Sequence, residues 1–552
     1  MIMLRLLFNL FFTSFIVISC QNQQIKCDML IKNGIIYDGT GESPFAGNVA
    51  IQDDKIVYIG SGGEFIADTI IDASGYSIAP GFINMLSWAY GGLVNDGRSL
   101  SDLKQGVTLE VFGEGSSPGP LSEEMKNEIY DRNTNIDSIP YTSFGEALQY
   151  LENKGVSINI ASFLGATTVR IHEVGYENRD ATPEELNKMK SLVGVSMQEG
   201  AMGIGSSLIY APADYASTEE LIELCKVASE FGGMYISHMR NEDNKLMKAL
   251  EELIRISIEA SIPAEIYHLK ASRKPNWHLL DSLIDRVNQV REEGHRITAD
   301  IYTYNASSTG LTGVIPTWVQ EGGHIAWINR MKDPNIREKL LSDIRNELLE
   351  QPPEGILMVG FRKDHMEEKY LGKTVAEAAV MRNQSPEEAI VEMVIEDDNR
   401  IQCIYFSMSE ENIRKKVQIP WVSFCSDAGS YSDISSEFKT HPRAFGSFIR
   451  VLGKYARDEQ LISIQEGIRK LSSLPATNLG IKDRGFLKEG YYADIVIFDL
   501  ENVNDYATFD QPLQFAQGVE HVLVNGIPVL LNGNHTNKFP GRFVKGPGYL
   551  KK

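Results

Sequence analysis

The sequence contains few cysteines, no run of basic residues and, after its first twenty residues, no long apolar stretch. Its five cysteines are scattered over 552 residues, and no two have the spacing of a zinc knuckle, which argues against a disulfide framework and a thiolate metal site. The net charge is −21 without a compensating basic patch, so no nucleic acid partner is expected. With 43% hydrophobic and 23% charged residues, the composition is that of a globular chain long enough for several domains.

The first twenty residues carry a long apolar run. Residues 6–18 are apolar, follow a single positive charge at Arg5, and are fewer than the roughly 20 residues that span a bilayer. The run ends in Val-Ile-Ser-Cys20, which resembles the lipobox of bacterial lipoproteins. We therefore expect a signal peptide over residues 1–19 and a tether over residues 20–28, with Cys20 as the lipid anchor.

This expectation concerns the location of the protein. An exported chain that is anchored through Cys20 would lie in the bacterial cell envelope, on the periplasmic side or at the outer membrane. It would meet the membrane only through its lipid. The alternative is an ordinary signal peptide, after which Cys20 has no special role.

Both ends of the chain consist of short strand-like runs divided by turn residues. Residues 29–80 contain such runs on either side of Asp38-Gly39 and Asp53-Asp54. A similar pattern, with a turn at Asn525-Gly526, closes the chain over residues 479–552. The pattern is typical of antiparallel β structure, and we expect the two ends to form one small β domain.

Residues 81–478 have a different rhythm, in which short apolar strands alternate with amphipathic helices. His238 and His268 each follow such a strand, and Asp300 lies within the next one. The intervals between these residues are 30 and 32 residues, the length of one strand, one helix and two loops. This α/β period fits a (β/α)8 barrel or a doubly wound sheet.

Eight candidate strands favour the barrel. They lie around residues 82–87, 108–113, 157–164, 202–207, 234–238, 264–268, 297–302 and 422–427. A further strand-like segment near residues 355–360 falls within a long connection, residues 321–407 approximately, where we expect a helical insertion or lid.

Polar residues stand at the C-terminal ends of several strands, namely Glu114, His238, His268, Asp300 and Asp427. In a barrel these ends converge on one mouth, where the active site of this architecture lies. Two histidines on consecutive strands, with carboxylates on others, indicate a metal site. Two imidazoles and one carboxylate suit Zn²⁺ and leave a fourth position open, as hydrolysis requires.

Several motifs make a resemblance specific. At the N-terminal end they are Lys32-Asn33-Gly34, Asp38-Gly39-Thr40-Gly41 and Ile78-Ala79-Pro80-Gly81-Phe82-Ile83, which resemble the entry to the amidohydrolase superfamily. Further along they are Gln105-Gly106-Val107-Thr108, Tyr235-Ile236-Ser237-His238-Met239-Arg240, His268-Leu269-Lys270, Asp300-Ile301-Tyr302, Ser426-Asp427, His441-Pro442-Arg443 and Asp483-Arg484-Gly485. These resemble motifs of the N-acyl-D-amino-acid deacylase (D-aminoacylase) family, and they follow one another in the same order as in that family. The resemblance implies a (β/α)8 barrel joined to a β-sandwich built from both chain ends.

The chain departs from the family pattern at two metal positions. Where the superfamily places His-x-His on the first strand, Leu86 and Trp88 stand here, and neither side chain binds zinc. Where D-aminoacylases have a ligand cysteine after the second strand, this chain has Glu114, whose carboxylate is the natural replacement. The expected site is therefore one Zn²⁺ per chain on Glu114, His238 and His268. In the alternative, Glu114 only orders its loop.

The resemblance also implies a reaction and a set of substrate contacts. The reaction is the zinc-dependent hydrolysis of the amide bond of N-acyl-D-amino acids, with Asp427 as the base; alternatively, Asp427 caps a strand end. The small-molecule substrate has an α-carboxylate, which cations and hydroxyl groups would bind. The expected contacts are Arg443, Lys270, Tyr302, Tyr210 and Ser308, together with Arg240, which follows His238 by two residues. The basic residues could instead be solvated, and the tyrosines could be barrel packing.

Two other functions compete with this prediction. A cyclic-amide hydrolase or a dipeptide hydrolase of the same superfamily is the first, but cyclic-amide members usually need a carboxylated lysine, and residues 202–207 contain no lysine. The second is a catalytically silent lipoprotein that binds peptides or acyl amino acids, which the loss of the His-x-His pair suggests. The metal content of the protein would distinguish these hypotheses. The sequence gives no indication of an oligomeric state.

Overall fold

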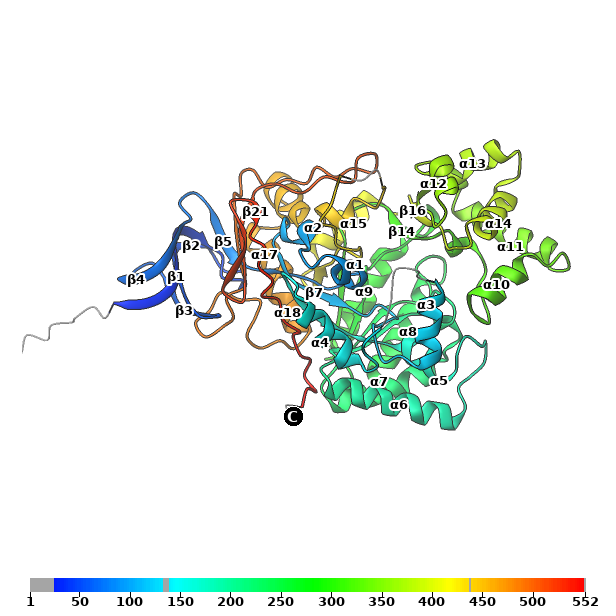
Figure 1. The fold of residues 1–552 in the computed structure, drawn as a ribbon, viewed down its shortest axis with the longest axis horizontal. Helices are drawn as coiled ribbons and strands as arrows, with labels where there is room; N and C mark the ends of the chain where they lie inside the picture. Colours follow the sequence, from blue (N-terminus) through cyan, green and yellow to red (C-terminus); the bar gives the residue numbers. More distant parts are fainter. Residues whose placement is uncertain (1–23, 133–138, 436–437, 551–552) are drawn as a thin grey trace, which may run out of the picture.

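The computed structural model describes residues 24–132, 139–435 and 438–550. Cys20 and the predicted signal peptide lie outside these ranges. Figure 1 shows a β domain at one end of the molecule, a barrel in the middle and a helical insertion at the opposite end. Among the described residues, no helix has the length and apolar character needed to cross a membrane.

The β domain is built from both ends of the chain, as the sequence predicts. Its nine strands form one sheet in the order β21-β20-β19-β18-β5-β1-β2-β3, with β4 also paired to β1. The strands are β1 (Ile25–Ile36), β2 (Phe45–Gln52), β3 (Lys55–Gly60), β4 (Phe65–Asp72), β5 (Ser77–Pro80), β18 (Ile495–Phe498), β19 (Val519–Val524), β20 (Ile527–Leu531) and β21 (Asn534–His535).

The sheet is mainly antiparallel, as the sequence predicts, but two of its strand pairs are parallel. Strand β1 pairs in parallel with β4 through its first half and with β5 through its second half. A register shift between Ile31 and Gly34 divides the two halves, which explains how one long strand has several partners. Alternation of buried and exposed residues reveals a strand but not the direction of its neighbour.

The central domain has the eight predicted barrel strands. Their order around the barrel is β6 (Phe82–Asn84), β7 (Val107–Phe112), β8 and β9 (Asn159–Ser162 and Leu164–Gly165), β10 (Gly203–Ser207), β11 (Met234–His238), β12 (Ala264–Ile266), β13 (Ile297–Ile301) and β17 (Val422–Phe424). Neighbouring strands are parallel throughout, and β8 and β9 act together as the third strand. The predicted fold, a (β/α)8 barrel with a β domain from both chain ends, is confirmed.

The barrel closes just beyond the ends of β6 and β17. The backbone N–H of Asp427 donates to the carbonyl of Leu86 at 2.9 Å, and the N–H of Trp88 donates to the carbonyl of Ala428 at 2.9 Å. These bonds hold the first and last strands side by side, so residues at opposite ends of the barrel sequence become neighbours at its mouth.

Helices surround the barrel and bury apolar faces against it (Figure 1). The helices that precede the insertion are α1 (Tyr90–Asn95), α2 (Leu100–Leu103), α3 (Glu123–Arg132), α4 (Phe144–Lys154), α5 (Ala166–Glu173), α6 (Pro183–Gln198), α7 (Thr218–Glu230), α8 (Leu246–Glu259) and α9 (Leu279–Glu292). Those that follow it are α15 (Glu410–Gln418), α16 (Arg443–Gly446), α17 (Ile464–Leu471) and α18 (Ser473–Asn478). Helix α8 illustrates the pattern, because its buried residues include Leu246, Leu250, Leu253 and Ile254.

The insertion forms a separate cluster of helices around its own apolar core. Its elements are β14 (Ser307–Gly310), α10 (Gly323–Met331), α11 (Arg337–Glu350), β15 (Ile356–Gly360), α12 (Asp364–Tyr370), α13 (Val375–Arg382), α14 (Pro386–Asp397) and β16 (Gln402–Tyr405). The strand-like segment near residue 355 is therefore β15, which belongs to a small antiparallel sheet rather than to the barrel. That sheet also includes β14, so the insertion begins before residue 321.

Glu265 on β12 is a buried acid whose titration should affect stability. Burial raises its pKa to about 8 from an ordinary value of 4.5, and repulsion from Asp300 adds to the shift. Between pH 4.5 and about pH 8, folded Glu265 thus keeps a proton that the unfolded chain loses. The free energy of unfolding therefore falls as the pH rises through this range, by up to about 1.4 kcal/mol per pH unit.

We expect Glu265→Gln to remove this loss, because the amide does not ionise. The melting temperature of the variant relative to the wild type should increase from pH 5 to pH 8, as measured by thermal unfolding at both pH values. A difference that stays constant with pH would show that Glu265 is not protonated in the folded protein.

Candidate metal and catalytic site

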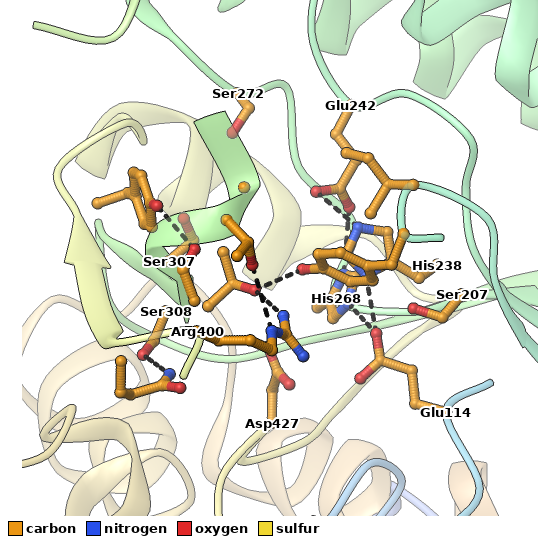
Figure 2. Close-up of a pocket in the computed structure, with 18 of the residues that line it drawn as sticks. Glu114, Ser207, His238, Glu242, His268, Ser272, Ser307, Ser308, Arg400 and Asp427 are labelled. Carbon is orange, nitrogen blue, oxygen red and sulfur yellow. Dashed lines mark hydrogen bonds and ion pairs between the residues drawn. The ribbon is translucent and has the colours of Figure 1, made fainter. Parts of the chain in front are cut away.

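A cavity of about 790 Å³ opens at the mouth of the barrel, between the strand ends and the insertion. Figure 2 shows side chains from several strand ends converging on it. The predicted residues Glu114, His238, His268 and Asp427 all line this cavity. The expectation that these strand ends share one site therefore agrees with the geometry.

Glu114 lies between the two histidines. Its Oε1 is 2.8 Å from Nδ1 of His238 and 3.0 Å from Nε2 of His268. One ligand atom from each of the three residues lies within 4.8 Å of the others, and all three side chains are buried. A carboxylate and two imidazoles that converge so closely form a donor set suited to a divalent cation such as Zn²⁺.

Two glycines allow Glu114 to reach this position. Gly113 has a φ of 108° and Gly115 a φ of 69°, values that side-chain-bearing residues rarely adopt. A Cβ atom on Gly113 would lie 2.3 Å from the carbonyl oxygen of Phe163, and one on Gly115 would lie 2.5 Å from Cβ of Ser207. The loop after β7 can therefore pack against its neighbouring strands only with glycine on both sides of Glu114.

His268 and Asp427 also have unusual backbone conformations. Their φ values are 34° and 49°, in the left-handed region that non-glycine residues seldom occupy. The backbone N–H of His268 donates to Oδ1 of the buried Asp300 at 2.8 Å, which fixes the turn after β12. Asp300 thus holds the backbone of His268 in place rather than its imidazole ring.

Glu242 is a site residue that the sequence analysis did not identify. Its Oε1 accepts a hydrogen bond from Lys270 Nζ at 2.8 Å and lies 3.2 Å from Nδ1 of His268. Its Oε2 lies 3.4 Å from Nε2 of His238. A carboxylate that faces both histidines can orient their rings and select their tautomers. The available signal was its place four residues after His238, in the loop that follows a barrel strand.

Neighbouring charges control the protonation of His268 and Glu114. Burial and Lys270 oppose a charge on His268, but the carboxylates of Glu242, Glu114 and Asp427 outweigh them and raise its pKa to about 10. Glu114 is affected in the opposite direction, because the two histidines overcome the cost of burial and lower its pKa. Metal binding would require neutral histidines, so a cation would have to compete with a proton at His268.

Trp88 occupies the position where the family pattern has a histidine. Its indole N–H donates to Oε2 of Glu114 at 3.0 Å and approaches Oδ1 of Asp427 at 3.2 Å. The side chain is 50% exposed, whereas Leu86 is fully buried. An indole N–H is therefore placed between the carboxylate of the expected metal site and that of the expected base.

Asp427 is paired with Arg443. The guanidinium donates to Oδ2 of Asp427 at 2.6 Å, and its Cζ lies 4.6 Å from the centroid of the Tyr302 ring. His441 supports the backbone of Arg443. Nδ1 of His441 accepts a hydrogen bond from the backbone N–H of Arg443 at 3.0 Å, and Nε2 of His441 lies 2.9 Å from the carbonyl oxygen of Ala306. Burial, aided by Arg443, lowers the pKa of His441, so this histidine remains neutral at physiological pH.

The other predicted substrate contacts lie in the cavity, but their polar atoms have different partners. Lys270, Tyr302, Tyr210 and Ser308 all line the cavity. The Tyr302 hydroxyl contacts Sδ of Met408 at 3.3 Å, and that of Tyr210 donates to Thr309 at 2.9 Å. Ser308 uses its hydroxyl to donate to the carbonyl of Cys403 at 2.9 Å.

The expectation for Arg240 was wrong. Its guanidinium binds the carboxylate of Glu252 and donates to the backbone carbonyls of Asp214 and Ala216. These contacts hold it against α8 and the loop before α7, and it does not line the cavity. Residues two apart point to the same side only while a strand continues, and here β11 ends at His238, so Arg240 need not follow the direction of His238.

Comparison with known proteins supports this interpretation. A D-aminoacylase from Alcaligenes xylosoxydans xylosoxydans is 30% identical over 525 residues, covering 95% of this chain and 99% of the relative. A model of the amidohydrolase family also matches residues 427–530. This chain belongs to the D-aminoacylase family of amidohydrolases. It is accordingly a metal-dependent hydrolase that acts on amide bonds.

Two solved structures extend the comparison to the metal. A D-aminoacylase studied for the role of its binuclear metal centre superimposes with a TM-score of 0.78 at 28% identity, covering 94% of this chain and 99% of that one. An N-acyl-D-glutamate deacylase from Bordetella bronchiseptica, solved with zinc and a phosphonate mimic of the tetrahedral intermediate, gives the same TM-score at 26% identity, covering 95% and 100%. The amidohydrolase relatives thus bind metal, and a donor triad is present here.

Replacing Glu114 tests the donor triad. We expect Glu114→Gln to weaken Zn²⁺ binding by at least about 100-fold, because a neutral amide loses the carboxylate charge and the contact with both histidines. Isothermal titration of the chelator-treated protein with Zn²⁺ measures the affinity. Glu347→Gln is the matched control, since this carboxylate lines the same cavity but contacts Arg273. Equal affinity in wild type and Glu114→Gln would exclude Glu114 as a ligand.

Replacing Trp88 tests the indole contact. Trp88→Phe keeps an aromatic ring but removes the donor to Glu114 and Asp427, so we expect kcat for amide hydrolysis to fall by about tenfold. The zinc content should not change, because indole is not a ligand. Unchanged kcat would contradict a role for the indole N–H, and loss of zinc would show that the ring holds the site together instead.

Proposed function

We propose that the protein is a zinc-dependent N-acyl-D-amino-acid deacylase, which releases a carboxylate and a D-amino acid. The convergence of Glu114, His238 and His268 beside Asp427 in one cavity is the observation that supports this activity most directly. The likeness to D-aminoacylase over almost the whole chain supports the substrate class. One zinc per chain is proposed, because Leu86 and Trp88 stand at the second metal position.

The residues of the chain would share the chemistry of hydrolysis. A cation on Glu114, His238 and His268 would supply Lewis-acid activation of the amide carbonyl and of water. Asp427 would accept the proton of the attacking water and deliver it to the nitrogen of the leaving amine. Arg443 and Trp88 would hold the two oxygens of Asp427 in position for both transfers.

The same cavity offers donors for the α-carboxylate of the substrate. Arg443 is buried, and its Nε has no hydrogen-bond partner among the described residues. Lys270 lies 5.9 Å from the centroid of the Tyr302 ring, on which Arg443 also stacks. We assign Arg443, Lys270 and Tyr302 to this carboxylate, with Ser308 and Tyr210 at the edge of the pocket. The guanidinium of Arg443 would then bind the substrate carboxylate while it remains paired with Asp427.

The localisation is part of the proposal. The apolar N-terminal run and Cys20 support export and lipid anchoring in the cell envelope. The described chain begins in the β domain, at the end of the molecule opposite the insertion (Figure 1). A tether attached there would leave the mouth of the barrel accessible to small molecules.

Asp427→Asn tests the proposed base. The amide cannot accept a proton, so we expect kcat for N-acetyl-D-amino acids to fall by about 10²- to 10⁴-fold, while zinc binding is retained. Steady-state kinetics on matched N-acetyl-D- and N-acetyl-L-amino acids, with zinc content by elemental analysis, give both readouts. Full activity of the variant would exclude this role. A zinc-loaded wild type that binds but does not hydrolyse any of these compounds would favour a silent binding protein.

A further inference from the structure

Most charged groups that line the cavity are already paired with one another. Lys270 binds Glu242 at 2.8 Å, and Arg443 binds Asp427 at 2.6 Å. Another lining residue, Arg273, binds Glu347 on α11 at 2.9 Å. These pairs neutralise three of the cations that a substrate could meet. They also fix the positions of the carboxylates around the expected metal site.

Arg400 is the exception. It lines the cavity from the insertion, in the turn between α14 and β16, and its side chain is exposed. Among the described residues, its guanidinium donates only to hydroxyl groups, at 3.3 Å to Thr312 and 3.2 Å to Thr309. Within residues 24–132, 139–435 and 438–550, no carboxylate forms an ion pair with it at 4.0 Å or less. The cavity therefore contains a full positive charge that has no carboxylate partner in the part of the chain that the structure describes.

Arg400 also lies close to the expected reaction centre. Its Cζ is 5.3 Å from the centroid of the Tyr210 ring, and the ring centroid of His238 lies 5.2 Å from the same centroid. The hydroxyl of Thr309 accepts hydrogen bonds from both Tyr210 and Arg400. Both the guanidinium and an expected metal ligand thus contact the same tyrosine ring, and Figure 2 shows Arg400 extending into the pocket beside Ser308.

The surroundings of Arg400 suit a carboxylate. Besides the two threonines, the adjacent wall carries Gln402, whose amide donates to Ser308 at 2.9 Å. These groups are neutral and can donate hydrogen bonds, and a planar guanidinium binds a carboxylate through two parallel N–H donors. A ligand carboxylate would thus give Arg400 the charge-assisted contacts that protein carboxylates give the other cations of the cavity.

We infer that Arg400 selects substrates that carry a second carboxylate in addition to the α-carboxylate. This inference rests on the proposed deacylase function, in which Arg443 and Lys270 receive the α-carboxylate. The second carboxylate belongs either to an acidic amino-acid side chain or to a dicarboxylic acyl group. Both would present the same chemistry to Arg400, and the substrate panel below separates them.

The test compares acids with their uncharged isosteres on the zinc-supplemented full chain. For the side chain, the pairs are N-acetyl-D-aspartate with N-acetyl-D-asparagine and N-acetyl-D-glutamate with N-acetyl-D-glutamine. For the acyl group, the pair is N-succinyl-D-leucine with N-butanoyl-D-leucine. We expect wild-type kcat/KM to favour the acid by at least about tenfold in one set of pairs, chiefly through KM.

Arg400→Gln should reduce this acid-to-neutral ratio to near one, and Arg400→Lys should restore it in part, because it keeps the charge but not the bidentate fork. Arg345→Gln is the matched control. Arg345 is another arginine of the insertion, but it is paired with Glu387 and lies outside the cavity. This control should leave the ratio at its wild-type value.

The possible results separate the inference from the function on which it rests. Hydrolysis of the neutral substrates without preference for either kind of acid would overturn the role of Arg400 and leave the deacylase function intact. Equal losses on acid and neutral substrates in Arg400→Gln would also overturn it, because Arg400 would then bind a group that all substrates share. Failure of the wild type to hydrolyse any member of the panel would overturn both.

Discussion

The site depends on a single carboxylate held between two imidazoles. Glu114 contacts His238 and His268 at hydrogen-bond distance, and all three residues are largely buried at the base of the cavity. In such surroundings an unpaired charge would be costly, so the three groups must share protons or a cation to remain buried. Glu242 completes this arrangement from the other side, since it faces both histidines and Lys270.

The barrel brings the remaining groups to this cluster by closing on itself. The hydrogen bonds between the end of β6 and the end of β17 hold Trp88 beside Asp427, although 339 residues separate them. The indole N–H thereby contacts the carboxylates of both Glu114 and Asp427. A neutral donor thus stands at the position where the family pattern supplies a metal-binding histidine, and the proposal of one zinc per chain rests on this difference.

The insertion provides the outer wall of the cavity, and this wall includes the positively charged Arg400. It has its own apolar core and is joined to the barrel by the small sheet of β14, β15 and β16. Because it has an apolar core of its own, its loops can change with little effect on the barrel strands that hold the donor triad. Arg400, at the edge of this unit, contributes a charge to the cavity while the chemistry is built from the barrel.

The sequence alone determined the architecture and the positions of the chemical groups along the chain. The period of about 30 residues located the barrel strands, and the polar residues after them located Glu114, His238, His268 and Asp427, because strand ends in a barrel converge on one mouth. Only the tertiary structure decided which side chains meet. It paired Arg443 with Asp427, turned Arg240 toward Glu252, brought in Glu242 and left Arg400 without a carboxylate partner among the described residues. These outcomes depend on loop conformations and on contacts between residues distant in sequence, which the spacing of residues along the chain does not encode.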